Sequence, residues 1–158
     1  MPVGKDEFRT ALGHFASGVT VVTTAGKDGS VRGMTVSAFS SLSLDPPLVL
    51  ICVENRTSIY EHLNEEGGFF AVNILAEDQE LVSRRFATKD TDRFDGIGYT
   101  TGATGSPILT GTLAFVECRV VNAYPGGDHT IFVGEVEAMG ATEGKPLAYF
   151  RGGYSKLV

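Results

Sequence analysis

The chain has 158 residues, of which 42% are hydrophobic and 20% are charged, and its formal net charge is −6 at pH 7. This length fits one domain over residues 1–158 with a substantial buried core. The negative charge argues against a nucleic-acid-binding surface, which needs clustered basic residues. We find no apolar run of membrane length and no leader, so we expect a cytoplasmic protein without a membrane segment.

A helix and a β-hairpin are the first predicted elements. Apolar residues recur at helical spacing over residues 5–17 and predict an amphipathic helix. β-branched residues predict a strand over residues 19–24. Lys27-Asp28-Gly29 is a turn signal, so we expect residues 31–39 to return as the antiparallel partner of that strand.

Residues 33–53 carry an unusual density of small hydroxyl side chains, namely Thr35, Ser37, Ser40, Ser41 and Ser43. A flat ligand with polar edges needs such donors, together with apolar walls for its faces. Pro46 and Pro47 lack a backbone N–H and cannot lie within a central ladder. We therefore expect a hydroxyl-rich loop ending at the prolines. Leu48–Val53 should follow as a strand covered on both faces.

Residues 54–58 should close this strand and open a helix that runs to about residue 64. Thr57 or Ser58 could serve only as a helix cap. The backbone N–H groups at the same place attract anions, and Arg56 adds a positive charge. These residues alone leave the two interpretations open.

The second half of the chain predicts further strands over residues 69–75, 112–124, 129–139 and 147–150, and a helix over residues 77–86. Asn73 interrupts an apolar run, and a structural hydrogen bond is the favoured role for a buried amide. Residues 87–107 form a polar, Gly-rich loop without periodicity, anchored only at Asp92-Arg93-Phe94, and we expect it to be either a site edge or an interface. Cys52 and Cys118 are expected as buried free thiols in a reducing compartment. No GxGxxG motif is present, so nucleotide binding would need another architecture than a Rossmann fold.

Several short motifs together resemble the flavin reductase family, although no single motif is specific. They are Thr35–Ser37, Ser41–Leu48, Phe70–Leu75 (FAVNIL), Ser83–Ala87 (SRRFA), Gly127–His129 (GDH) and Phe150–Tyr154 (FRGGY). They follow the family's order and span nearly the whole chain. The resemblance implies a mainly β fold, an antiparallel Greek-key split barrel of the FMN-binding kind with a few peripheral helices. It also implies a homodimer with flavin sites near the subunit interface.

The same resemblance implies NAD(P)H-dependent reduction of FMN or FAD, by hydride transfer from nicotinamide C4 to flavin N5. Reduced flavin would then pass to a partner flavin-dependent monooxygenase. The cofactors carry this chemistry, so the protein needs to align two rings and requires neither a metal nor a nucleophile. NADH is favoured over NADPH because no arginine cluster for a 2′-phosphate is evident. The motifs do not choose between FMN and FAD.

The resemblance also assigns individual residues. Thr35, Val36 and Ser37 would line the isoalloxazine edge, and Ser40 and Ser41 would bond its polar atoms. The phosphate and ribityl region would be held by Asn55, Arg56, Thr57, Ser58, Ser83, Arg85 and Phe86. His129 would cover the nicotinamide side, with Asp128 mainly supporting the turn. Three residues near the end could either stack on a nucleotide or pack at an interface: Tyr149, Arg151 and Tyr154.

Two other classes of function remain open. One is a flavin-binding electron carrier or sensor that keeps its FMN and has no NADH turnover. The other is a non-enzymatic barrel that binds haem or another planar ligand. The motifs at residues 127–129 and 151–154 favour the reductase over the carrier, and the missing Cys-His ligand pair argues weakly against haem.

Overall fold

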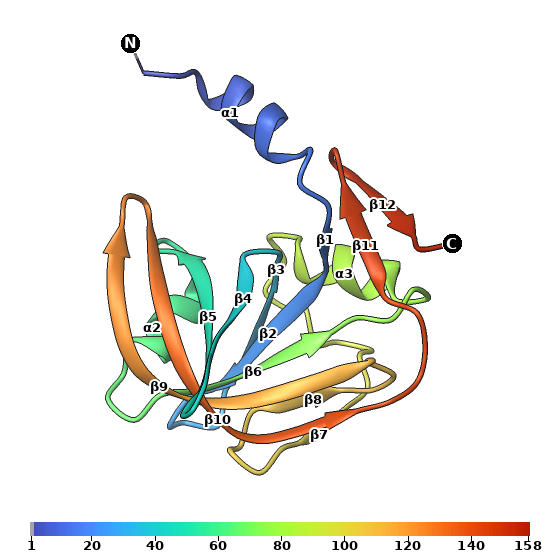
Figure 1. The fold of residues 1–158 in the computed structure, drawn as a ribbon. Coiled ribbons are helices and arrows are strands. Elements are labelled where there is room, and N and C mark those ends of the chain that lie inside the picture. Colours follow the sequence, from blue (N-terminus) through green and yellow to red (C-terminus); the bar gives the residue numbers. More distant parts are fainter. Residues whose placement is uncertain (1) are drawn as a thin grey trace.

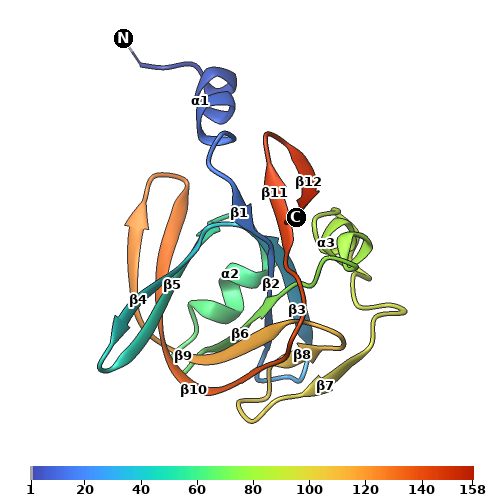
Figure 2. The ribbon, with the colours of Figure 1, turned by 45° about the vertical axis from the view of Figure 1, so that its right-hand side comes forward.

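Seven antiparallel strands form one strongly curved sheet (Figures 1 and 2). In this computed structural model, which describes residues 2–158, the strand order is β3-β2-β6-β9-β10-β5-β4. The strands are β2 (Thr20–Ala25), β3 (Val31–Val36), β4 (Phe39–Leu44), β5 (Pro47–Glu54), β6 (Phe69–Ile74), β9 (Ala114–Gly126) and β10 (His129–Ala141). The edge strands β3 and β4 are consecutive in the chain, so the curvature brings the two ends of the sheet together. The predicted mainly β, antiparallel fold is confirmed.

Smaller sheets and three short helices flank this main sheet. One sheet contains β1 (Ser17–Gly18), β11 (Leu147–Phe150) and β12 (Gly153–Lys156), and another pairs β7 (Tyr99–Thr101) with β8 (Pro107–Leu109). The helices are α1 (Lys5–Leu12), α2 (Ser58–Leu63) and α3 (Glu80–Phe86). Across residues 2–158, the helices are all too short and too polar to cross a membrane.

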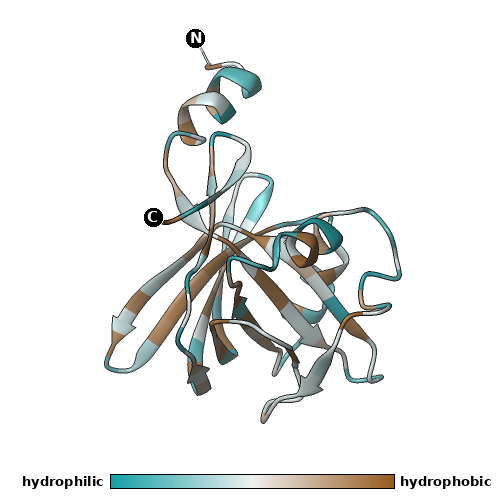
Figure 3. Ribbon diagram, turned by 90° about the vertical axis from the view of Figure 1, so that its right-hand side faces the viewer, coloured by the Kyte–Doolittle hydropathy of each residue, from teal (hydrophilic) through white to brown (hydrophobic). Residues whose placement is uncertain are grey.

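The core has two parts, which lie on opposite faces of β2. Val22 points into the larger part, with Ile51, Phe70 and Phe132, whereas Val21 points into the smaller part beside α3. Figure 3 shows hydrophobic segments along the strands at the centre of the molecule, and β2 and β6 are buried on both faces. β2 is therefore a rigid base for its hairpin partner β3.

Asn73 shows how this core accommodates a polar group. Its amide nitrogen donates to the Val21 carbonyl oxygen at 3.0 Å and to Thr23 Oγ1 at 3.1 Å. Its amide oxygen accepts from the Leu109 N–H at 2.9 Å, which ties β8 to the sheet. The structural role predicted for this residue is confirmed.

Two predictions about residues 33–53 are wrong in part. The serine-rich segment is strand β4 rather than a loop, because its backbone pairs with β5 from Phe39 to Leu44. An edge strand tolerates hydroxyl side chains, since its outer face remains in water. β5 is confirmed as a strand, but only Val49, Ile51 and Val53 are fully buried, and the intervening residues are half-buried.

The ends of the chain also differ from expectation. The first helix ends at Leu12 instead of residue 17, and it stands away from the sheet (Figure 1). Its apolar stripe is uncovered, with Phe8, Leu12 and Phe15 exposed by 58%, 56% and 81%. At the other end, Arg151 and Gly152 form the tight turn between β11 and β12, with φ values of 51° and 78°, and β12 begins at Gly153.

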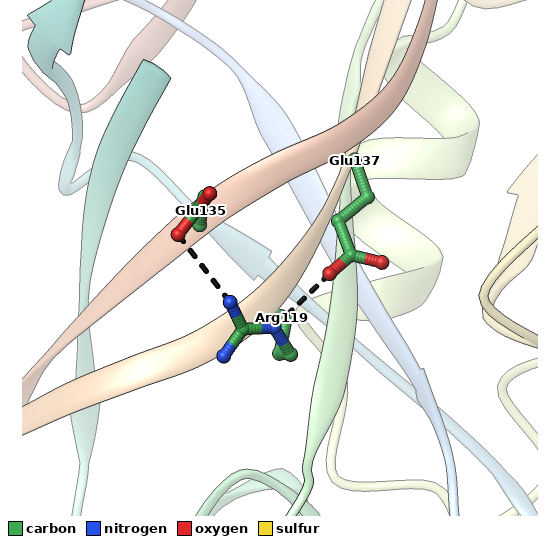
Figure 4. A network of polar contacts seen from close by, with 3 residues as sticks. All are labelled: Arg119, Glu135 and Glu137. Carbon is green, nitrogen blue, oxygen red and sulfur yellow. Dashed lines mark hydrogen bonds and ion pairs between the residues drawn. The ribbon is translucent and has the colours of Figure 1, made fainter. Parts of the chain in front are cut away.

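Arg119 illustrates how the outer face of the sheet uses its charges. Its guanidinium on β9 contacts Glu135 at 3.3 Å and Glu137 at 3.0 Å, both on β10 (Figure 4). The three side chains are 36–44% exposed, so water screens each pair and it stabilises the fold by about 0–1 kcal/mol. Arg119 is therefore paired with acidic neighbours, unlike the cations of the candidate site described below.

Candidate functional site

Three cavities lie in series along β3. The first, the tyrosine cavity, has a volume of about 220 Å³ and is lined by Val19, Thr35, Ser37, Ser83, Ala87, Tyr149 and Tyr154. The second, the central cavity, has a volume of about 450 Å³ and is lined by Met34, Thr35, Glu54, Arg56, Thr57, Ser58, Ile59, Phe86, Ala87, Thr88, Lys89 and Arg93. The third, the outer cavity, is also about 450 Å³ and is lined by Val31, Arg32, Gly33, Ser58, Lys89, Asp90, Thr91, Arg93 and Phe94.

Neighbouring cavities share their walls. Thr35 and Ala87 border both the tyrosine and the central cavity. Ser58, Lys89 and Arg93 border both the central and the outer cavity. The cavities therefore adjoin one another, and together we call them the β3 cleft, which has residues of β3 on one side and residues of α3 and its following loop on the other.

The tyrosine cavity combines aromatic faces with fixed hydroxyl groups. Thr35 Oγ1 donates to the Ser83 carbonyl oxygen at 2.6 Å, which joins β3 to α3. The Ser83 and Tyr154 hydroxyl oxygens lie 2.7 Å apart and share a hydrogen bond. The Tyr149 and Tyr154 rings meet edge to face at 5.3 Å, and the Arg84 guanidinium lies 4.9 Å from the Tyr154 ring centre. This arrangement suits the face and the polar edge of a flat ring.

Phe86 holds the middle of the cleft in place. Its ring is fully buried and packs edge to face against Phe94 at 5.0 Å. A Cβ atom on Gly33 would lie 2.6 Å from the Phe86 ring. β3 can therefore approach α3 this closely only because residue 33 is glycine, and Phe86 supports the cleft wall from behind.

Arg56, Lys89 and Arg93 line the central cavity, and within residues 2–158 none of the three makes an ion pair. Arg93 Nη1 donates to the Gly33 carbonyl oxygen at 2.9 Å, and its buried Nε has no hydrogen-bond partner in that same range. Burial lowers the pKa of the Arg93 guanidinium, and the nearby Asp90 carboxylate partly opposes this shift. With the Ser58 hydroxyl at the same wall, these unpaired donors suit a phosphate group.

Lys89 and Arg93 are functional candidates that sequence reasoning missed. Both lie in the 87–107 loop, which was predicted to be either a site edge or an interface, and no periodicity indicates which of its side chains face a site. Two basic residues within seven positions of the SRRFA motif were the available signal.

Arg85, which the resemblance assigned to the phosphate, has a different position. Its Nη2 donates to the carbonyl oxygens of Asp92 at 2.7 Å and Asp95 at 3.2 Å, and its Nε donates to that of Arg93 at 3.2 Å. Arg85 does not line the β3 cleft. It holds the loop that carries Arg93.

Four other assigned residues also lie outside the cleft lining, and one of them, Ser41, is exposed on β4. Val36 is buried in the larger part of the core. Ser40 Oγ donates to the Ser41 carbonyl oxygen at 2.9 Å, and Ser40 lines a separate groove beside α1. Asn55 Oδ1 accepts from Thr130 Oγ1 at 2.7 Å, which links the α2 loop to β10.

His129 lies at the tip of the β9–β10 hairpin, opposite Glu54 in the β5–β10 register. Its Nδ1 donates to Asp128 Oδ1 at 2.7 Å. This bond and the adjacent imidazole lower the pKa of the Asp128 carboxyl. Asp128 thus orients the imidazole, beyond the turn-supporting role expected for it. Arg151 is placed apart from His129, at the exposed β11–β12 turn, where its N–H donates to the Gly13 carbonyl oxygen at 2.8 Å.

The described residues include no group of three or more His, Cys, Asp or Glu side chains that could hold a metal ion. Cys52 and Cys118 are free thiols, as predicted, although Cys52 is only half-buried. Burial raises the pKa of the Cys118 thiol to about 12, so this group is an inert core residue.

The lining of the cleft suits a flat aromatic ligand that carries phosphate, and comparison with known proteins gives the family of the chain. The family model described as "Flavin reductase like domain" matches residues 12–157. The reductase subunit HsaB of a flavin-dependent monooxygenase from Rhodococcus jostii (strain RHA1) is 44% identical over 151 residues, covering 95% of this chain and 76% of that protein. An NADH-dependent flavin reductase from Rhodococcus sp. is 44% identical over 153 residues, covering 94% and 84%.

A solved structure supports the same relationship. The Streptomyces globisporus C-1027 NADH:FAD oxidoreductase SgcE6, in complex with NAD and FAD fragments, superimposes with a TM-score of 0.92 at 37% identity, covering 98% of this chain and 93% of that one. The chain belongs to the flavin reductase family.

Proposed function

We propose that this protein is an NADH-dependent flavin reductase that supplies reduced flavin to a partner monooxygenase. The observation that carries this proposal is the β3 cleft, in which an aromatic, hydroxyl-lined cavity adjoins a cavity lined by three cations that make no ion pair within residues 2–158. A flavin mononucleotide unit has the same order of groups, a flat ring with polar edges joined through a ribityl chain to a phosphate. Family membership gives the reaction class independently of the cleft.

The residues of the cleft divide between the two ends of the flavin. Thr35, Ser37 and Ser83 present hydroxyl groups to the ring edge, and Tyr149 and Tyr154 present ring faces. At the other end, charge-assisted hydrogen bonds to the phosphate come from Arg56, Lys89, Arg93, Thr57 and Ser58.

Hydride transfer from nicotinamide C4 to flavin N5 is chemistry that the two bound cofactors supply. The chain's own contribution is to position the rings, so that two reactants meet at short distance with reduced entropic cost. His129 is placed by Asp128 at the rim formed by β5 and β10, and we assign it to the nicotinamide nucleotide. Glu54, which lies between His129 and the central cavity, connects the two parts of the site.

The direct test is NADH oxidation by the purified protein with and without added flavin. A reductase that uses flavin as a substrate oxidises NADH at a rate that rises and saturates with free flavin. An electron carrier that keeps its FMN binds flavin without this turnover, and that result would refute the proposal. NADPH in place of NADH tests the nucleotide preference, because the motif-based reasoning favours NADH. Stimulation of a monooxygenase by the reduced flavin tests the partner assignment.

We further propose that the protein is a homodimer in a reducing, cytoplasmic compartment, to which the two free thiols are suited. The uncovered stripe of α1 faces a groove of about 410 Å³ lined in part by Phe39, Ser40 and Leu50, and β4 has a free edge. A second copy would cover both surfaces and bring its residues close to Ser37. Light scattering should report a dimer, and Phe15→Ser should shift it toward monomer. Leu81→Ser, which changes an 80% exposed residue on α3, should not.

A further inference from the structure

The outer cavity provides much more room than a single phosphate needs. Its volume of about 450 Å³ equals that of the central cavity. A water molecule takes about 30 Å³ in the liquid, so this space holds a group of many non-hydrogen atoms. Because Ser58, Lys89 and Arg93 line both cavities, the central and outer cavities adjoin at these residues.

The lining of the outer cavity has a definite chemistry. Arg32 reaches it from β3, where Nη1 donates to the Ser58 carbonyl oxygen at a long 3.4 Å, and it joins Lys89 and Arg93 there. No ion pair within residues 2–158 neutralises Arg32, and Asp90 is the acidic residue of the lining. Phe94 adds an aromatic side chain. Cationic groups beside an aromatic ring and guanidinium planes suit a phosphate that carries a nucleobase.

Resting on the flavin reductase function proposed above, we infer that the outer cavity binds the adenosine monophosphate half of FAD. The protein therefore prefers FAD to FMN. The two phosphates of FAD are directly linked, and the wall shared by the central and outer cavities carries the cations that two linked phosphates require. NADH also carries an adenylate group. Its phosphates, however, have no covalent link to a flavin phosphate in the central cavity, so the connection between the cavities favours FAD.

Flavin titrations on the full chain test this inference. For the unmodified protein we expect FAD to bind at least about tenfold more tightly than FMN, the lower range for one additional charge-assisted contact. Arg32→Ala should weaken FAD binding by about tenfold and change FMN binding by less than about twofold. Lys27→Ala is the matched control, because it removes an exposed cation from the turn of the same hairpin and should change neither affinity.

The outcomes separate this inference from the proposed function. Equal affinity for FMN and FAD, or equal weakening of both by Arg32→Ala, would overturn the FAD assignment while flavin reduction persists. A raised KM for NADH in Arg32→Ala with FMN as acceptor, at unchanged FAD affinity, would assign the cavity to the nicotinamide nucleotide and overturn it too. Loss of all flavin binding and NADH oxidation in the unmodified protein would instead refute the reductase function.

A second measurement needs no variant. Excess AMP should displace FAD from the unmodified protein and leave FMN bound, since AMP occupies the outer cavity and FMN does not. Failure of AMP to displace FAD would contradict the inference even if Arg32→Ala did not fold.

Discussion

Arg85 and Arg56 should separate the stability of this protein from its affinity for flavin. In Arg85→Ala, three hydrogen bonds from a charged donor to the 92–95 loop are lost. A buried bond of this kind contributes about 1.5–3 kcal/mol. Arg85 is half-buried and the freed carbonyls reach water, so we expect a total loss of about 1–2 kcal/mol. For a chain of this length, the melting temperature should fall by about 2–8 °C.

Arg56→Ala should behave in the opposite way. Arg56 is exposed and, in the structure of residues 2–158, makes no ion pair, so its removal should change the free energy of unfolding by less than about 0.5 kcal/mol. The central cavity, however, loses one charged donor to the phosphate. Flavin affinity should therefore fall by about ten- to a hundredfold.

For each variant, thermal melts of the flavin-free protein give the melting temperature, and flavin titrations give the flavin affinity. Lys27→Ala is a control that should change neither the melting temperature nor the flavin affinity. Arg85→Ala is expected to weaken flavin binding only through the displaced Arg93. If Arg85→Ala reduced flavin affinity without lowering the melting temperature, Arg85 itself would hold the phosphate. The inference that it supports the loop would then be wrong.

Other consequences of the structure can be tested in the same preparation. His129→Ala should slow NADH oxidation more than it weakens flavin binding, and the reverse pattern in paired kinetics and titrations would contradict the nucleotide role. The hydrogen bond to the His129 imidazole lowers the pKa of the Asp128 carboxyl. The contact between the two side chains should therefore persist above the ordinary carboxyl pKa and be lost as the pH falls through the lowered pKa of Asp128. NMR titration of the two side chains can follow this loss. Gly33→Ala places a methyl group against the Phe86 ring and should lower the free energy of unfolding in urea by about 1–3 kcal/mol. Cys118 should react with iodoacetamide near neutral pH only after unfolding, and rapid labelling of the native protein would show that the core opens.

Local sequence signals predicted most of the fold because each of them specifies the conformation of only a few neighbouring residues. The turn at Lys27–Gly29 and the β-branched run before it specify the β2–β3 hairpin, and Gly29 has the expected positive φ of 82°. The serine-rich segment at Phe39–Leu44 was assigned to a loop, since its side chains lack strand-like apolar bulk. Its strand conformation depends on pairing with β5, a contact that composition does not report.

The candidate site shows the same difference between what local motifs predict and what depends on contacts made in the fold. Thr35, Ser83 and Tyr154 are far apart in sequence, yet motif resemblance selected all three and the structure connects them by hydrogen bonds. Lys89 and Arg93 could not be selected, because the direction of a side chain in an irregular loop depends on what anchors the loop. Here the anchor is Arg85, which the resemblance of the SRRFA motif had assigned to the flavin phosphate.

Three cations of the β3 cleft make no ion pair with any residue in the described range 2–158, although the protein has 19 acidic and 13 basic residues. Acidic partners satisfy Arg84 and Arg119 elsewhere, whereas Arg56, Lys89 and Arg93 remain available at the cleft. Partly solvated charges bind a phosphate through contacts that water can replace, so binding remains reversible. A reductase that passes its product to a separate oxygenase requires such reversibility. The division of the cleft between a rigid strand and a loop held by one arginine therefore suits a flavin that enters and leaves in each cycle.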